Sequence, residues 1–237
     1  MESVARFQSN LPTDSARTPG RSCRRLHGRF AWVTATESTT GQTGRARRGP
    51  GRNTGATRQR IVAESARLFA DRGYHATGVA DISRAAGLGS GALYHHMGSK
   101  EEILLEICRP HVIEVLARGE AIQCSDEPAL QKLRKLARVH MEMIATRTLE
   151  LRVSLRELDS FTGSNKIEMR QLRDRTEAVW DAIVADGLRR GELAGVDPLF
   201  VKAVLGALNY AVLWFHEGGA LSSDEVADRI IALMLGE

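Results

Sequence analysis

The stretch GLGSGALYHHMGSKEEIL, residues 87–104, decides the fold of this chain. Small residues come first, a tyrosine and two histidines follow, and a lysine leads into an amphipathic pattern. Gly87 is placed to end one helix, and the segment up to Gly98 has room for one more short helix with Leu93 turned inward. Ser99 and Glu102 match a capping box at the start of a long helix.

The residues before this stretch follow a helical period. Ile61, Leu68 and Phe69 share one face from residue 57 onward, charged residues occupy the other, and a glycine at position 73 is placed to end the helix. Thr77 is expected to cap a second short helix. A supporting helix, a glycine-containing turn and a further short helix make up a helix-turn-helix unit, which we therefore expect over residues 56–100.

The last short helix of this unit is expected to face DNA. Small residues let a helix N-terminus approach phosphate closely, while rings and polar tips reach base edges or the backbone. The predicted DNA-binding residues are Thr77, Gly89, Ser90, Gly91, Ala92, Tyr94, His95, His96 and Lys100. For Tyr94, the alternative is a ring that mainly packs within the three-helix unit.

Beyond Lys100 the pattern is helical throughout. Turn and cap signals separate the expected helices, which span 100–122, 128–146, 148–159, 165–190, 198–216 and 223–235. The last two carry more apolar surface than one chain can bury, which favours pairing with a second copy. The sequence thus predicts an all-α protein with a helical domain over residues 101–237, which we expect to bind an effector and to dimerise.

Charge is distributed unevenly along the chain. Residues 1–56 carry a net +7, residues 57–100 carry +3, and residues 101–237 carry −6. A basic end on an acidic body indicates that the first part meets a polyanion, for which DNA is the leading candidate. Residues 1–55 are rich in Arg, Gly, Ser and Thr and lack apolar periodicity, so we expect a disordered arm. Its alternatives are a phosphate-contacting arm and a merely solvated tail.

The segment at residues 57–104 resembles the N-terminal domain of the TetR family of transcriptional regulators. The resemblance rests on Ala66, Leu68, Phe69 and Gly73, on Asp81, Ile82, Ala86 and Gly87, and on the string GALYHHMGSKEE at residues 91–102. Gly78 and Ala80 depart from it, since family members often have Thr and Arg there. The resemblance implies a dimeric repressor that binds a near-palindromic operator, pairs through its C-terminal helices and is controlled by a small molecule.

The C-terminal part resembles, more weakly, the branch of this family that responds to acyl-CoA thioesters of lipid or sterol catabolism. The carriers are WFHEGGALSSDEVAD at residues 214–228 and Trp180, although His216 stands where Arg or Lys is common. Arginines could meet the CoA phosphates while an indole stacks on adenine. The expected effector-binding residues are Leu151, Leu155, Arg170, Arg173, Trp180, Ile183 and Leu208. The alternative for the arginines, which include Arg175, is a charged outer helix face.

Other classes of protein fit the sequence less well. GLGSGA resembles a dinucleotide-binding fingerprint but follows a helix instead of a strand, and Ser90 lacks the glycine two residues earlier that a hydrolase elbow requires. A metal site built on His95, His96, Cys108 and His111 is disfavoured, because adjacent histidines diverge on a helix. We expect no enzyme activity, no cofactor, no membrane span and a cytoplasmic location. The remaining alternatives are a repressor for another hydrophobic effector, such as a drug or flavonoid, and a ligand-independent nucleoid-type DNA binder.

Overall fold

The computed structural model describes residues 54–89 and 91–236, so the predicted arm lies almost wholly outside the described residues. Within these ranges all regular structure is helical and no strand forms, which confirms the all-α prediction. The elements are α1 (Thr54–Arg72), α2 (Val79–Ala85), the 3₁₀ helix η4 (Ala92–His95), α3 (Lys100–Gln123), α4 (Ala129–Thr146), α5 (Thr148–Arg156), α6 (Gly163–Arg190), α7 (Phe200–Tyr210), the 3₁₀ helix η5 (Ala211–Leu213) and α8 (Ser223–Leu235).

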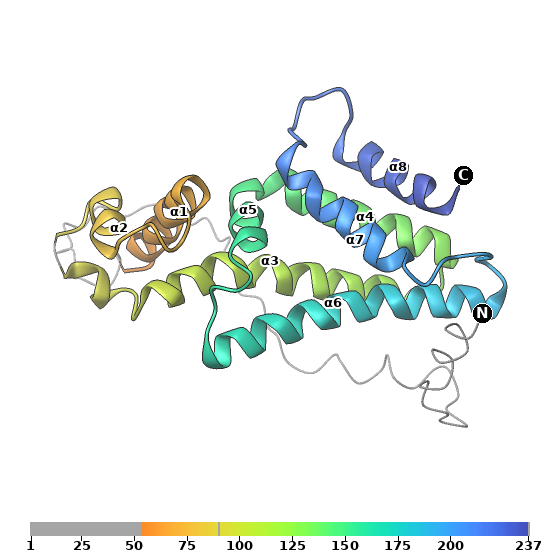
Figure 1. Cartoon of the computed structure of the whole chain (residues 1–237), viewed down its shortest axis with the longest axis horizontal. Coiled ribbons are helices and arrows are strands. Elements are labelled where there is room, and N and C mark those ends of the chain that lie inside the picture. The colour runs from red at the N-terminus through yellow and green to blue at the C-terminus, as the bar shows by residue number, and fades with distance from the viewer. Residues whose placement is uncertain (1–53, 90, 237) are drawn as a thin grey trace, which may run out of the picture. The chain divides into compact units, whose positions relative to one another are not determined.

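The N-terminal helices pack around a core that also includes Val153, Phe161 and Met169 of the body, and we call it the N-terminal core. Phe69 of α1, Ile82 of α2 and Leu93 of η4 are fully buried there, together with Ile103 and Leu104 of α3. Figure 1 shows α1 and α2 beside the start of α3. Burial of one such side chain stabilises the fold by about 1.5–3 kcal/mol. The inward orientation predicted for Leu93 is therefore confirmed.

The start of α3 is capped largely as the sequence predicts. The Ser99 hydroxyl accepts a hydrogen bond from the Glu102 backbone N–H at 3.0 Å. The Glu102 carboxylate accepts from the N–H of Gly98 at 2.7 Å, one residue before the N-cap, and also pairs with Arg58 of α1 at 2.9 Å. The Glu102 carboxylate thus helps to cap the start of α3 and also joins it to α1.

The cap of α2 differs from the prediction. The N-cap is Gly78, whose backbone N–H donates to the Asp81 carboxylate at 3.2 Å. The predicted cap, Thr77, is only 1% exposed, and its hydroxyl donates to the Gly73 carbonyl at 2.8 Å. Its side chain points back because the last turn of α1 leaves carbonyls that need donors. The expected helix 198–216 also divides, into α7 and η5.

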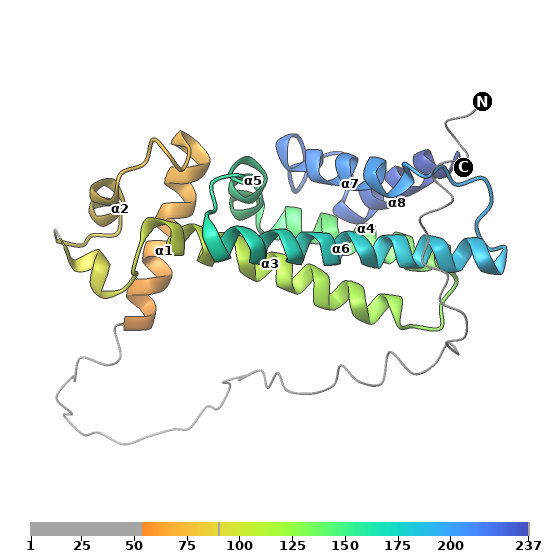
Figure 2. The same cartoon turned by 60° about the horizontal axis from the view of Figure 1, so that its bottom comes forward.

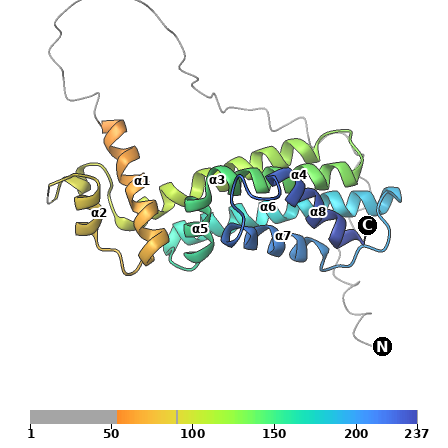
Figure 3. The same cartoon turned by 90° about the horizontal axis from the view of Figure 1, so that it is seen from above.

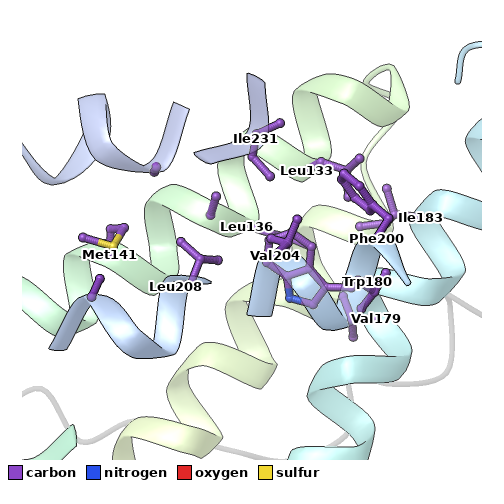
Figure 4. Close-up of a cluster of buried hydrophobic side chains, with 14 of the residues drawn as sticks. Leu133, Leu136, Met141, Val179, Trp180, Ile183, Phe200, Val204, Leu208 and Ile231 are labelled. Carbon is purple, nitrogen blue, oxygen red and sulfur yellow. The ribbon is translucent and has the colours of Figure 1, made fainter. Parts of the chain in front are cut away.

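The remaining helices pack around a second core, which we call the body core. Helix α3 lies alongside α6 and contacts α4, and α4 packs on α8 (Figure 2). Helix α5 contacts α1, α3 and α4, and it lies between α1 and α7 in the view from above (Figure 3). Figure 4 shows Trp180 among the aliphatic side chains of the body core. None of the helices in the described ranges is both long and apolar enough to cross a membrane.

Two helical glycines provide a matched test of this packing. A Cβ at Gly187 of α6 would lie 2.5 Å from the Cβ of Ala129 and 2.7 Å from Leu193, whereas a Cβ at Gly206 of α7 would meet no atom within 4 Å. We expect Gly187→Ala to lower the free energy of unfolding by about 1–3 kcal/mol, because the body core cannot accommodate the methyl group. Gly206→Ala should leave it unchanged or raise it by up to about 1 kcal/mol. Urea denaturation would measure both, and equal effects would contradict the packing.

Candidate DNA-binding surface and effector cavity

The predicted recognition element is a single 3₁₀ turn, η4, at the end of the N-terminal unit. Gly91 precedes it with φ +82°, a conformation that favours glycine. Tyr94 is 58% exposed, and His95 is exposed beside it, so both rings are available to an external partner. His96 is half-buried because its carbonyl accepts from Arg58 at 2.8 Å and turns the residue toward α1.

The small residues of the predicted surface are only partly described. Gly89 and Gly91 are exposed and Ala92 is half-buried, which leaves the backbone before η4 accessible. Ser90 lies outside the described residues. Arg84 of α2, which the sequence analysis did not select, is largely exposed and pairs with Asp81 at 3.2 Å. Arg84 could have been selected from the sequence, because it lies on the polar face of the supporting helix of a helix-turn-helix unit.

Two of the predicted DNA contacts are engaged inside the protein. The Lys100 ammonium donates to the carbonyls of Tyr74 at 2.9 Å and Thr77 at 3.1 Å, and it lies 4.2 Å from the centre of the Tyr74 ring. Thr77 is buried, as described above. Lys100 and Thr77 hold the turn between α1 and α2 in place. They therefore orient the DNA-binding unit in the absence of DNA.

A cavity of about 370 Å³ lies within the body. Helices α3 to α7 all contribute to its wall, and its size falls within the range of about 300–1,000 Å³ that is typical of small-molecule sites. The lining residues are His111, Val112, Val115, His140, Met143, Leu151, Ser154, Leu155, Leu158, Arg173, Thr176, Glu177, Lys202, Leu205, Gly206 and Asn209.

The structure separates the predicted effector residues into three groups. Leu151, Leu155 and Arg173 line the cavity. Ile183 and Leu208 are buried in the body core, and so is Trp180, which is only 2% exposed and therefore packs against aliphatic neighbours instead of offering a face to an adenine. Arg170 is exposed at 3.9 Å from Asp174, and Arg175 pairs with Glu120, so these two arginines occupy an outer helix face.

Neutral imidazoles form part of the polar wall of the cavity. Burial lowers the pKa of His111 to about 4, helped by the positive charge of Arg147. Burial also lowers the pKa of His140 to about 4, and its Nε2 lies 3.1 Å from the Asn209 Oδ1. Sequence patterns gave no sign of this group, because its members come from α3, α4 and α7.

Cations and one acid complete the wall. Lys202 and Glu177 form an ion pair at 2.6 Å, and hydrogen bonding to that carboxylate raises the pKa of Lys202. Arg173 supplies further positive charge. Within the described ranges, no three His, Cys, Asp or Glu side chains gather as a metal site would require. Cys108 lies in the N-terminal core, where burial raises the pKa of its thiol to about 12.

Comparison with known proteins places this architecture in a family. Residues 61–107 match the model of bacterial regulatory proteins of the tetR family, and residues 126–237 match the tetracyclin repressor-like C-terminal domain. The transcriptional repressor KstR2 of Mycolicibacterium smegmatis is 31% identical over 184 residues, which cover 76% of this chain and 89% of that protein.

Solved structures agree with this placement. The TetR family regulator PfmR of Thermus thermophilus superimposes with a TM-score of 0.68 at 35% identity, over 75% of this chain and 97% of that one. The ketosteroid regulator KstR2 of Mycobacterium tuberculosis gives a TM-score of 0.69 at 27% identity, over 76% and 93%.

A helix-turn-helix unit joined to a helical body with a ligand-sized cavity defines a DNA-binding regulator. The chain belongs to the TetR family of transcriptional regulators.

The exposed tip of η4 gives a test of sequence recognition. We expect His95→Ala to change the preferred base at one position of the binding site, because a base-edge contact is worth about 1–3 kcal/mol of discrimination. Selection from randomised duplexes would measure the preference. His216→Ala, which removes an exposed histidine of the body, is the control. An identical selected site for His95→Ala and the unaltered protein would remove His95 from the readout surface.

The buried His111 predicts a pH-dependent stability. Its pKa in the folded chain, about 4, lies below the ordinary value of 6.5, so at intermediate pH the unfolded chain binds a proton that the folded chain does not. This contribution to stability is complete above about pH 6.5 and is lost as the pH falls toward 4. Between pH 7 and pH 5 the loss should be about 2 kcal/mol. In urea denaturation, His111→Leu should reduce the loss and His216→Leu should not.

Proposed function

We propose that this protein is a dimeric transcriptional repressor that leaves its operator when a small molecule occupies the body cavity. The observation that carries the proposal is the position of α5. This helix contributes Leu151 and Leu155 to the cavity wall and packs against α1 of the DNA-binding unit. A ligand that prefers one arrangement of α5 therefore has a direct route to the DNA-binding unit.

The lining favours an effector with an apolar body and an anionic end. Most of the lining surface is apolar, and Arg173 supplies positive charge beside the Lys202–Glu177 ion pair. An acyl-CoA thioester has both parts, since its acyl group needs an apolar slot and its phosphates need cations. The ketosteroid regulator among its relatives supports a lipid or sterol source for the acyl group. If the cavity recognises only the apolar part of the ligand, the alternative is a repressor that responds to a drug or a flavonoid.

The dimer contact that we propose lies on the C-terminal helices. Tyr210, Leu213 and Trp214 are exposed around the end of α7 and η5, and Leu233 and Met234 are exposed on α8. Such a set is typical of a protein interface. A dimer of this kind would present two DNA-binding units to successive major grooves about 34–36 Å apart, which requires a near-palindromic site.

We assign no catalytic role to the cavity and place the protein with its operator in the cytoplasm. The cavity also favours a ligand-controlled repressor over a nucleoid-type DNA binder, which has no use for a ligand-sized site. A nucleoid-type binder would hold DNA with little sequence preference, so the duplex selection described above separates the two functions.

The effector can be tested with a matched pair of arginines. Acyl-CoA thioesters from hexanoyl to palmitoyl, the corresponding free acids, and CoA alone would be titrated against a labelled operator complex. We expect the thioesters to release the DNA and the free acids and CoA not to, because the cavity recognises both the acyl chain and the CoA phosphates. Arg173→Ala should weaken the thioester response about tenfold or more, corresponding to one lost charge-assisted contact.

Arg170→Ala is the control, since it removes the same charge from the same helix outside the cavity. Equal responses of the two variants, or release by free acids at the same concentration, would contradict the CoA assignment and favour the broader hydrophobic effector.

A further inference from the structure

We propose that Glu157 is a positioning residue that ties the turn between α1 and α2 to the end of α5, and that through this tie occupancy of the cavity changes DNA binding. The regulatory part rests on the proposed function. The tie itself rests only on contacts within the described chain.

Glu157 joins two segments that are far apart in the sequence. Glu157 directly follows Arg156, the last residue of α5, and it is only 5% exposed. One carboxylate oxygen, Oε1, accepts from the backbone N–H of Tyr74 at 3.0 Å. The other, Oε2, accepts from the Ser160 hydroxyl at 2.7 Å. Oε2 is thus held within the body, whereas Oε1 reaches the DNA-binding unit and also lies 3.7 Å from the Arg156 Nε.

The segment held by Glu157 is the entry to the helix-turn-helix. Tyr74 lies in the turn at residues 73–78, immediately before α2. The carbonyls of the same turn are held by Lys100 of α3. Arg156 packs against the turn as well, since a Cβ at Gly73 would lie 2.9 Å from its guanidinium. The orientation of α2 and η4 therefore depends on where α3 and the end of α5 hold this turn.

The same short helix faces both the cavity and the N-terminal core. Leu151, Ser154 and Leu155 line the cavity, whereas Val153 is fully buried in the N-terminal core. A helix of nine residues has no internal hinge, so a shift at its cavity side also moves its end at Glu157. The part of the cavity wall formed by α5 and the Glu157–Tyr74 hydrogen bond therefore belong to one short helix and its C-cap residue.

A buried carboxylate makes this tie sensitive to small shifts. If α5 moves away from the turn, the Tyr74 N–H and a buried charge both lose a partner, which costs more than the loss of a neutral surface contact. Other polar contacts nearby are more exposed. Arg58 pairs with Glu102 and Glu106, all about one-third exposed, and the Ser160 hydroxyl lies 3.1 Å from the His75 Nε2 at the surface, so these contacts contribute less. The hydrogen bond from the Tyr74 N–H to Glu157 therefore determines whether the turn at residues 73–78 stays attached to the end of α5.

The first experiment needs no effector. Glu157→Ala, Glu157→Gln and the control Glu150→Ala on the same helix would be compared by operator affinity and by hydrogen exchange of the Tyr74 amide. We expect Glu157→Ala to speed this exchange and to weaken operator binding, each at least tenfold. Glu157→Gln should recover most of both, since its amide oxygen still accepts, and Glu150→Ala should match the unaltered protein. Operator affinity unchanged in Glu157→Ala would overturn the positioning role.

The second experiment tests the coupling with decanoyl-CoA. In Glu157→Ala, we expect the loss of operator affinity caused by decanoyl-CoA to be at least fivefold smaller than in the unaltered protein, while decanoyl-CoA binds the DNA-free variant with unchanged affinity. A merely structural role would leave the full effector response on top of weaker DNA binding, and that result would overturn the coupling. If decanoyl-CoA does not act on the unaltered protein, its choice as effector fails, and the first experiment still decides the positioning role of Glu157.

Discussion

Helix α3 contributes buried side chains to both hydrophobic cores, and the rest of the structure depends on this shared burial. The first turns of α3 place Ile103, Leu104 and Ile107 in the N-terminal core, and its second half places Leu116 in the body core. Because α3 is one helix from Lys100 to Gln123, with Pro110 inside it, the packing of each core restricts the direction of the other. Helix α5 adds a second connection, since Val153 belongs to the N-terminal core while its neighbours along the helix face the cavity. The DNA-binding unit is therefore held by helices whose other sides line a ligand-sized space.

This arrangement explains why polar contacts gather at the turn before α2. Lys100, Glu157 and Thr77 all satisfy backbone groups of residues 73–78, although they come from three parts of the chain. Through Thr77 the turn satisfies only part of its own N–H and C=O groups, so Lys100 of α3 and Glu157 at the end of α5 complete it. The residues that hold this turn are consequently buried or half-buried, whereas Tyr94 and His95 are exposed.

Most of the helices could be predicted from local signals. Apolar spacing, glycine stops and the Ser99 cap depend on residues within a few positions of one another, and the structure has helices at all of those places. The Thr77 cap could not be predicted correctly, since its hydroxyl had two acceptable partners and the choice depended on the end of α1. Trp180 raised the same difficulty: an amphipathic residue near arginines fits a ligand face or a core equally well until the neighbouring helices are in place.

The sequence by itself determined the class of the protein and its all-α architecture, because these follow from local patterns in residues 57–104 and from helical periodicity after them. Only the tertiary structure decided which arginine faces the cavity, which histidines are buried and neutral, and that Glu157 reaches Tyr74 across 83 positions of the chain. Arg170 and Arg173 lie less than one helical turn apart, yet they face an outer surface and a cavity. Which side of α6 is covered is set by the packing of α3, α4 and α7 on it, and no local pattern encodes that packing.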